Sequence, residues 1–136
     1  MAEPTTMSLL RRCLGLIAVP VLVGGCGGSS SAIPDDAFPI VANADLAVGE
    51  QRLLVGVMTL DAESLAAPDL PIEIDLYAPE AVEPSFSVPG TFVWTVPEVR
   101  GLYRAQVSFD RAGIWRVAVH TGNDPPTQSV PFNVAT

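Results

Sequence analysis

The stretch GLYRAQVSFDRAGIWRVAVH, Gly101 to His120, decides the fold class of this chain. Apolar and polar side chains alternate along it both before and after the residues DRAG. A period of two is typical of β-strands that bury one face in a core. We therefore predict two antiparallel strands whose inward side chains are Tyr103, Ala105, Val107 and Phe109 in the first, and Trp115, Val117 and Val119 in the second.

The connection between these strands predicts a hairpin register. A three-residue turn at Arg111–Gly113, with glycine in the left-handed position of a G1 bulge, lets both apolar sets share one face. Facing residues pair across such a hairpin. The register therefore places Arg104 beside His120, the only histidine, where its positive charge would disfavour a bound metal cation. The predicted pairs are Phe109 with Trp115, Val107 with Val117 and Ala105 with Val119 inside, and Ser108 with Arg116 and Arg104 with His120 outside.

Alternation of the same kind recurs along the rest of the chain, and helical periodicity is absent. In Ile72–Ala78, for example, the isoleucines and Leu76 are expected to face the core, while Glu73, Asp75 and Tyr77 face water. We predict one all-β domain over residues 38–136, an immunoglobulin-like antiparallel β-sandwich, in which Trp94 and Trp115 are core aromatics. Its further strands are expected at Phe38–Ala42, Ala44–Val48, Gln51–Leu60, Thr91–Val96 and Gln128–Val134, with loops at Asp61–Pro71 and around Pro84.

The N-terminal region has the layout of a signal peptide. Arg11 and Arg12 precede an uncharged apolar run, Cys13–Val23, that is shorter than the roughly 20 residues of a membrane-spanning helix. The residues VGGC, 23–26, resemble the bacterial lipobox, in which the cysteine is lipidated and the segment before it is removed. The resemblance implies a signal peptide over residues 1–25 and a lipid anchor on Cys26.

Residues 26–37 begin with the lipidated cysteine and continue as GGSSSAIPDDA, a composition typical of a flexible tether. Two acyl chains or more would hold the protein stably on a membrane. The expected location is therefore the cell envelope, on the extracytoplasmic side of a bacterial membrane. The alternative is an ordinary secretory signal with Cys26 as a thiol, for which Cys13 is the single possible intramolecular partner.

Charge narrows the range of partners. The chain has seven Lys and Arg against fifteen Asp and Glu, a formal net charge of −8. Nucleic acid and anionic lipid headgroups repel such a surface, so no nucleic-acid partner is expected. The charge is unevenly spread, because Asp35–Glu98 holds twelve acids and one arginine, whereas Val99–Thr136 holds four arginines and two aspartates. Either these arginines pair with carboxylates on neighbouring strands, or they orient the domain on a membrane-protein partner.

The pattern G-x-Y-x-A-x-V-x-F-x-x-x-G-x-W-x-V-x-V over Gly101–Val119, followed by QSVPFNV, resembles the last strands of small immunoglobulin-like domains in exported bacterial proteins. These include the YtkA-like group and modules associated with redox domains. The motifs that carry the resemblance are structural ones, so it implies the fold far more than a function. It also gives Gly101 and Tyr103 the spacing of a tyrosine corner, although Val99 stands where an aspartate is usual. No second cysteine follows Cys26 to form a redox pair.

Residues that could carry chemistry are few. Copper would need soft ligands, but only Met58, expected to be core filler, and His120 remain after Cys26. Calcium could use Asp35, Asp36, Asp61, Glu63 and Asp69, whose spacing matches no calcium loop. Ser108 and His120 are not opposite each other in the predicted register, and no carboxylate is placed to orient the imidazole.

The sequence therefore predicts a lipid-anchored, non-catalytic binding or assembly module without a cofactor, which acts on an envelope protein or a small ligand. The alternatives are a copper-binding or calcium-binding accessory protein and, third, an enzyme of unknown class. A minor alternative for the two tryptophans is a binding platform on the surface of the sandwich.

Overall fold

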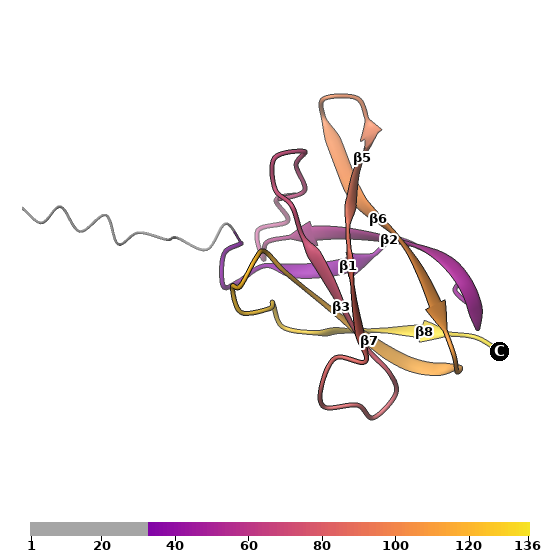
Figure 1. The fold of residues 1–136 in the computed structure, drawn as a ribbon. Helices are drawn as coiled ribbons and strands as arrows, with labels where there is room; N and C mark the ends of the chain where they lie inside the picture. The colour runs from indigo at the N-terminus through magenta and orange to yellow at the C-terminus, as the bar shows by residue number, and fades with distance from the viewer. Residues whose placement is uncertain (1–32) are drawn as a thin grey trace, which may run out of the picture.

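The computed structural model describes residues 33–136, which form two packed antiparallel β-sheets (Figure 1). The strand order is β1-β2-β6-β5 in the first sheet and β4-β3-β7-β8 in the second. This is the arrangement of an immunoglobulin-like sandwich, so the predicted fold class is confirmed. The strands are β1 (Phe38–Val41), β2 (Gly49–Met58), β3 (Glu73–Tyr77), β4 (Phe86–Pro89), β5 (Thr91–Val96), β6 (Arg100–Phe109), β7 (Gly113–His120) and β8 (Val130–Val134).

The core lies between the sheets and is built from the alternating apolar positions. The inward side chains that the sequence predicted on β3, β6 and β7 are buried, as are those of β2. Aromatic rings fill its centre, because Phe109 packs edge-on against Trp115 at a centroid distance of 5.0 Å and against Phe132 at 5.9 Å. The alternation therefore identified correctly which side chains face inward.

The predicted hairpin between β6 and β7 is wrong, because the two strands belong to different sheets. Arg104 pairs with Leu54 of β2 and Thr91 of β5, while His120 pairs with Glu73 of β3. The facing pairs proposed across the turn, including Ser108 with Arg116, are therefore not formed. Alternation fixes the side of a strand that is buried, but two strands that face each other across a core show the same pattern as two that lie side by side.

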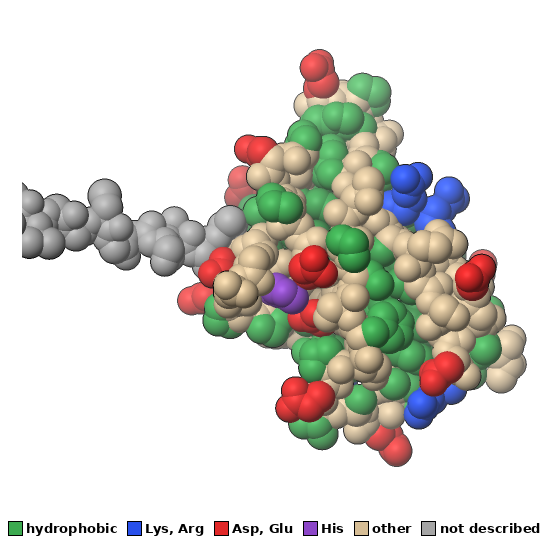
Figure 2. Space-filling view, viewed as in Figure 1, with side chains coloured by type: hydrophobic (Ala, Val, Ile, Leu, Met, Phe, Trp, Pro, Cys, Tyr) green, Lys and Arg blue, Asp and Glu red, His purple; other side chains and the backbone are tan. Residues whose placement is uncertain are grey.

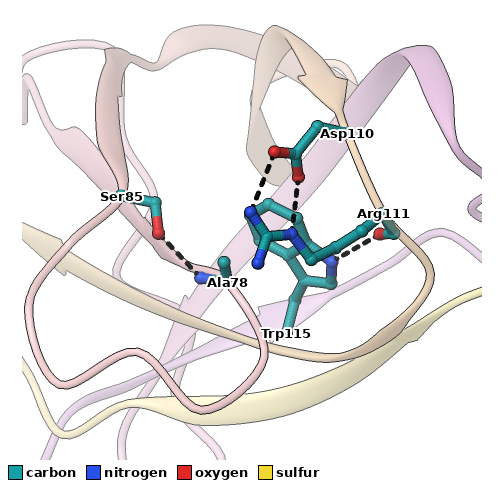
Figure 3. A network of polar contacts seen from close by, with 5 residues as sticks. All are labelled: Ala78, Ser85, Asp110, Arg111 and Trp115. Carbon is teal, nitrogen blue, oxygen red and sulfur yellow. Dashed lines mark hydrogen bonds and ion pairs between the residues drawn. The ribbon is translucent and has the colours of Figure 1, made fainter.

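The chain crosses between the sheets at residues 110–112, and the crossing is held by a core side chain (Figure 3). The indole Nε1–H of Trp115 donates to the carbonyl oxygen of Arg111 at 3.0 Å. This bond satisfies a polar group that is otherwise surrounded by apolar atoms. Gly113 has a φ of 132°, so glycine is required there, but it begins β7 and forms no G1 bulge.

The tyrosine corner is also not formed. The hydroxyl of Tyr103 donates to the carbonyl oxygen of Leu70 at 2.6 Å, and the N–H of Ala67 donates to the hydroxyl at 3.3 Å. In a tyrosine corner the hydroxyl bonds to backbone only a few residues upstream. Here it spans 33 residues to Leu70 and fastens the long loop between β2 and β3 to the middle of β6.

Several boundaries differ from those predicted. Ile33 and Ala37 are buried in the core, so the packed domain begins before the expected boundary at Phe38. Residues 44–48 form no strand, and Ala47 makes an isolated parallel bridge to Ala135. Just before them the side chain of Asn43 pairs with the backbone of β2: its Nδ2 donates to the carbonyl oxygen of Arg52, and its Oδ1 accepts from the N–H of Leu54. The short strand β4 was expected to be loop.

Trp94 is not a core residue, since 45% of it is exposed. It lies on the β5–β6 hairpin, which projects beyond the second sheet (Figure 1). Its ring stacks edge-on against Phe92 at 4.8 Å, and Phe92 in turn contacts Tyr103 at 5.8 Å. The aromatic packing of the core therefore continues outward along the hairpin and ends at an exposed tryptophan.

The tip of this hairpin is a strained turn. The N–H of Val99 donates to the carbonyl oxygen of Val96 at 3.0 Å, with Pro97 and Glu98 between them. A proline at the second position of the turn and a positive φ at the third position are features of a type II turn. Glu98 has a φ of 58°, a conformation that glycine adopts at lower cost.

Candidate functional site

A polar cluster centred on Asp75 lies on the outer face of the second sheet. Asp75 was expected to face water, but it is only 4% exposed. Its Oδ1 accepts a hydrogen bond from the hydroxyl of Ser87 at 2.5 Å, and its Oδ2 lies 2.9 Å from Nδ1 of His120. Because Ser87, Asp75 and His120 come from β4, β3 and β7, the cluster joins three neighbouring strands.

The expectation that no carboxylate orients the imidazole is therefore wrong. Asp75 was missed as its partner because the predicted hairpin placed His120 beside Arg104 instead of β3. In a serine-histidine-aspartate relay the serine hydroxyl bonds to the imidazole. Here Ser87 bonds to the carboxylate, so the hydroxyl is turned away from the base that would activate it. This geometry fits a structural polar network better than nucleophilic catalysis.

Tyr77 and Arg116 lie beside this cluster. The guanidinium carbon of Arg116 sits 4.8 Å from the centre of the Tyr77 ring, a cation–π contact. Its Nη1 donates to the hydroxyl of Ser129 at 3.0 Å, and its Nη2 donates to the carbonyl oxygen of Ala81. Burial of Tyr77, together with the negative charge of Asp75, raises the pKa of its hydroxyl. Arg116 is thus held by groups of its own sheet and the adjoining loops.

The surface around His120 is a shallow acidic hollow. It is lined by Asp75, Tyr77, Glu83, His120 and Asp124, among others. Figure 2 shows the imidazole at the surface with acidic side chains on both sides of it. Nevertheless, within residues 33–136 no three histidine, cysteine, aspartate or glutamate side chains lie close enough together to hold a metal ion.

The other predicted metal ligands are not brought together. Met58 ends β2 in the first sheet, whereas His120 ends β7 in the second. Met58 is not core filler either, because it is half-buried and lines a groove on the outer face of its sheet. Asp61, Glu63 and Asp69 are exposed in the loop that follows β2. Cys26, the predicted lipidation site, lies outside the described residues.

The groove that contains Met58 is the second candidate site. It runs over the outer face of the first sheet and is bounded by residues of the β2–β3 loop and the tip of the β5–β6 hairpin. Its position follows from the strand register, since Ile40 is opposite Gly56 on β1 and β2, and Leu102 of β6 is opposite Val93 of β5. Six of the residues that line it are Ile40, Gly56, Met58, Val99, Arg100 and Leu102.

Apolar side chains around this groove are exposed to an unusual degree. Val99 is 75% exposed and Ile40 is 40% exposed. Gly56 lies in the floor, and a Cβ added to it would meet no atom within 4 Å. The absence of a side chain there leaves an open space that a group from another molecule can enter. We call the surface defined by the six residues above the β2–β6 groove.

Comparisons with protein-family models, with curated proteins and with solved structures found no match to this chain. Among the residues that the structure describes, no helix has both the length and the apolar character needed to span a membrane.

Proposed function

We propose that this chain is a lipid-anchored, non-catalytic binding or assembly module that acts on an envelope protein at the extracytoplasmic side of a bacterial membrane. The lipobox-like residues VGGC at 23–26 support the anchor on Cys26. The observation that carries the binding role is the β2–β6 groove, an open hollow in which exposed apolar side chains lie beside polar ones and over a glycine. Exposed apolar surface of this kind is typical of protein interaction sites.

The anchor and the groove act together in this proposal. Confining the domain to the membrane surface raises its effective concentration near a membrane-bound partner, so even a weak surface contact becomes occupied. The same domain without its anchor would have to find this partner by diffusion from solution. Both parts are therefore needed for efficient recovery of a partner from native membranes.

The test is a crosslinked pull-down of the full lipoprotein from its native membranes. Gly56→Phe should fill the groove without disturbing the sheet, because an added Cβ has free space there. Ser108→Phe is the matched control, since it places the same ring on an exposed position at the far end of β6. Cys26→Ser removes the anchor.

We expect one envelope protein to be recovered with the unmodified chain and with Ser108→Phe, and to be lost with both Gly56→Phe and Cys26→Ser. Equal recovery with Gly56→Phe would contradict the groove as the binding surface. Mass spectrometry of the purified chain checks the anchor separately, and an unmodified Cys26 would refute it.

A second candidate function is metal binding, which one observation favours. Asp75 contacts Nδ1 of His120, and a carboxylate behind an imidazole is the arrangement found around metal-ligating histidines. The free Nε2 would supply one ligand to copper, with the remainder from solvent or a partner. Calorimetric titration of the full chain with Cu(I), Cu(II) and Ca²⁺ tests it, and the absence of heat and of a shift in Tm would remove this candidate.

A further inference from the structure

We infer that the β2–β6 groove receives a protein segment that carries acidic side chains beside apolar ones. This inference rests on the proposed binding function and specifies the chemistry of the partner. Its basis is the placement of one arginine in the groove and two beside it on the same face of the sheet, in a chain whose formal net charge is −8.

The arginines of the described residues fall into two groups. Arg111 pairs with Asp110 at 3.1 Å, and Arg116 is bound by Ser129 and Ala81. In contrast, within residues 33–136 the guanidinium groups of Arg52, Arg100 and Arg104 make no ion pair and no hydrogen bond. The partner of Arg111 is its neighbour in sequence, so within residues 33–136 none of these arginines pairs with a carboxylate on a neighbouring strand, and that sequence alternative is wrong.

The three free arginines lie on one face. Arg104 is opposite Leu54, and Arg52 is opposite Gln106, on the adjacent strands β6 and β2. Arg52 and Arg104 are thus diagonal neighbours on the outer face of the first sheet, a spacing of about 7–8 Å in antiparallel pairs. Arg100 lines the groove itself, two positions before Leu102. The basic side chains visible in Figure 2 lie along one side of the view, while acidic ones are spread over it.

Unpaired like charges at this spacing repel each other. A carboxylate-bearing partner would relieve that repulsion and add charge-assisted hydrogen bonds, because a guanidinium matches the geometry of a carboxylate. The adjoining apolar surface at Ile40, Gly56 and Leu102 would bury leucine-like or valine-like side chains of the same segment. The two features therefore specify one partner with both kinds of side chain.

The arrangement also fixes the orientation of the segment. The wall of the groove formed by the β2–β3 loop contains Ala62, and that loop carries the exposed acids Asp61 and Glu63. Acidic side chains of the partner would be repelled at that end. They therefore lie toward Arg52 and Arg104, and the apolar side chains lie over Gly56.

An anionic membrane surface is the less favourable occupant. It would extend past the arginines and meet Asp61, Glu63 and Glu98, as well as a domain with an excess of negative charge. Electrostatic repulsion from such a surface grows with its extent, whereas a short segment presents its carboxylates only where the arginines lie. The observations therefore favour a protein segment.

The test uses the full chain in phosphatidylcholine nanodiscs and a short fluorescent peptide with glutamates at one end and leucines and valines at the other. Binding is followed by fluorescence anisotropy, and a matched peptide carries lysines in place of the glutamates. We expect the glutamate peptide alone to bind, and its affinity to fall with added salt, because salt screens exposed charges. Gly56→Phe should abolish binding.

Charge-reversal variants test the arginines directly. Arg52→Glu combined with Arg104→Glu should weaken glutamate-peptide binding at least about tenfold. Arg111→Glu is the control, because it reverses one arginine at the far end of the sandwich and should leave binding unchanged. The Tm of the Arg52→Glu and Arg104→Glu double variant should remain close to that of the unmodified chain, since both side chains are exposed and unpaired. The Tm of Arg111→Glu should also change little, because it loses only an exposed ion pair.

Three outcomes would overturn the inference: equal binding of both peptides, loss of peptide binding in nanodiscs that contain phosphatidylglycerol, or occupation of the groove by a second copy of the chain in sedimentation experiments. None of these readouts depends on capture of a native partner. A failure here beside a successful pull-down would therefore reject the partner chemistry and leave the proposed function standing.

Discussion

Removing one hydroxyl group should loosen the wall of the β2–β6 groove. In Tyr103→Phe the ring and its contact with Phe92 at 5.8 Å are retained, so no large cavity forms. The substitution removes two hydrogen bonds of the hydroxyl group: the 2.6 Å bond that it donates to the carbonyl oxygen of Leu70, and the 3.3 Å bond that it accepts from the N–H of Ala67. These two bonds hold the loop that contributes Ala62 to the groove.

The expected cost follows from the groups left without partners. A net contribution of about 1 kcal/mol is usual for one hydrogen bond, and a buried polar group left unsatisfied adds about 1–3 kcal/mol. The Tyr103 side chain is buried, with 1% exposed, but its partners Ala67 and Leu70 are half-buried. Water can therefore replace some of the bonds that the loop backbone loses, and we expect the free energy of unfolding to fall by about 2 kcal/mol. For a domain of this size that corresponds to a decrease in Tm of about 10 °C.

Urea unfolding followed by tryptophan fluorescence measures this change, since Trp115 is buried in the core. Tyr77→Phe is the matched control, because among the described residues the Tyr77 hydroxyl makes no hydrogen bond; its effect should stay within about 0.5 kcal/mol. Glutamate-peptide affinity should also fall in Tyr103→Phe. If the two variants lose the same stability, the Tyr103 hydroxyl does not fasten the loop.

Three further outcomes are expected. Glu98→Gly should raise the free energy of unfolding by about 0.5–1 kcal/mol, because it relieves a φ of 58°; thermal melting checks this, and a lower Tm would contradict it. Gly101→Ala should destabilise by about 3 kcal/mol, because its Cβ would lie 2.2 Å from Cζ of Phe92, whereas Gly56→Ala should change stability by less than about 0.5 kcal/mol. Burial raises the pKa of Tyr103 above its ordinary 10.0, so above that pH the unfolded chain loses a proton that the folded chain keeps. Stability should then fall as pH rises, and less steeply in Tyr103→Phe; identical alkaline titrations of the two chains would refute this.

The fold class could be predicted from local patterns because alternation is a property of each strand alone. The inward-facing side chains of β3, β6 and β7 follow directly from it, whereas the burial of Asp75 and Tyr77 on the other face of β3 does not. The pairing partners of β6 could not be predicted in this way. A turn at residues 110–112 is compatible with a hairpin within one sheet or with a crossing between sheets, and only the packing of the whole core selects the crossing.

The errors about the candidate sites have the same origin. His120 was assigned to Arg104 because the strands were paired wrongly, and its true partner, Asp75, is 45 residues away in sequence. Trp94 alternates like a core residue, but the β5–β6 hairpin extends past the opposite sheet and leaves it exposed. Sequence alternation indicates a face, and it contains no information about whether a second sheet covers that face.

The sequence by itself determined that the chain forms a β-sandwich and which side chains of β3, β6 and β7 point into its core. Its lipobox-like residues around Cys26 predict an anchor. These are local properties, encoded in neighbouring residues. Only the tertiary structure decided that Asp75 meets His120. It also decided that Arg100 lies unpaired in a groove that contains Gly56, with Arg52 and Arg104 beside it on the same face of the sheet. Such contacts join distant segments, and they are set by strand order and register, which depend on the packing of the whole domain.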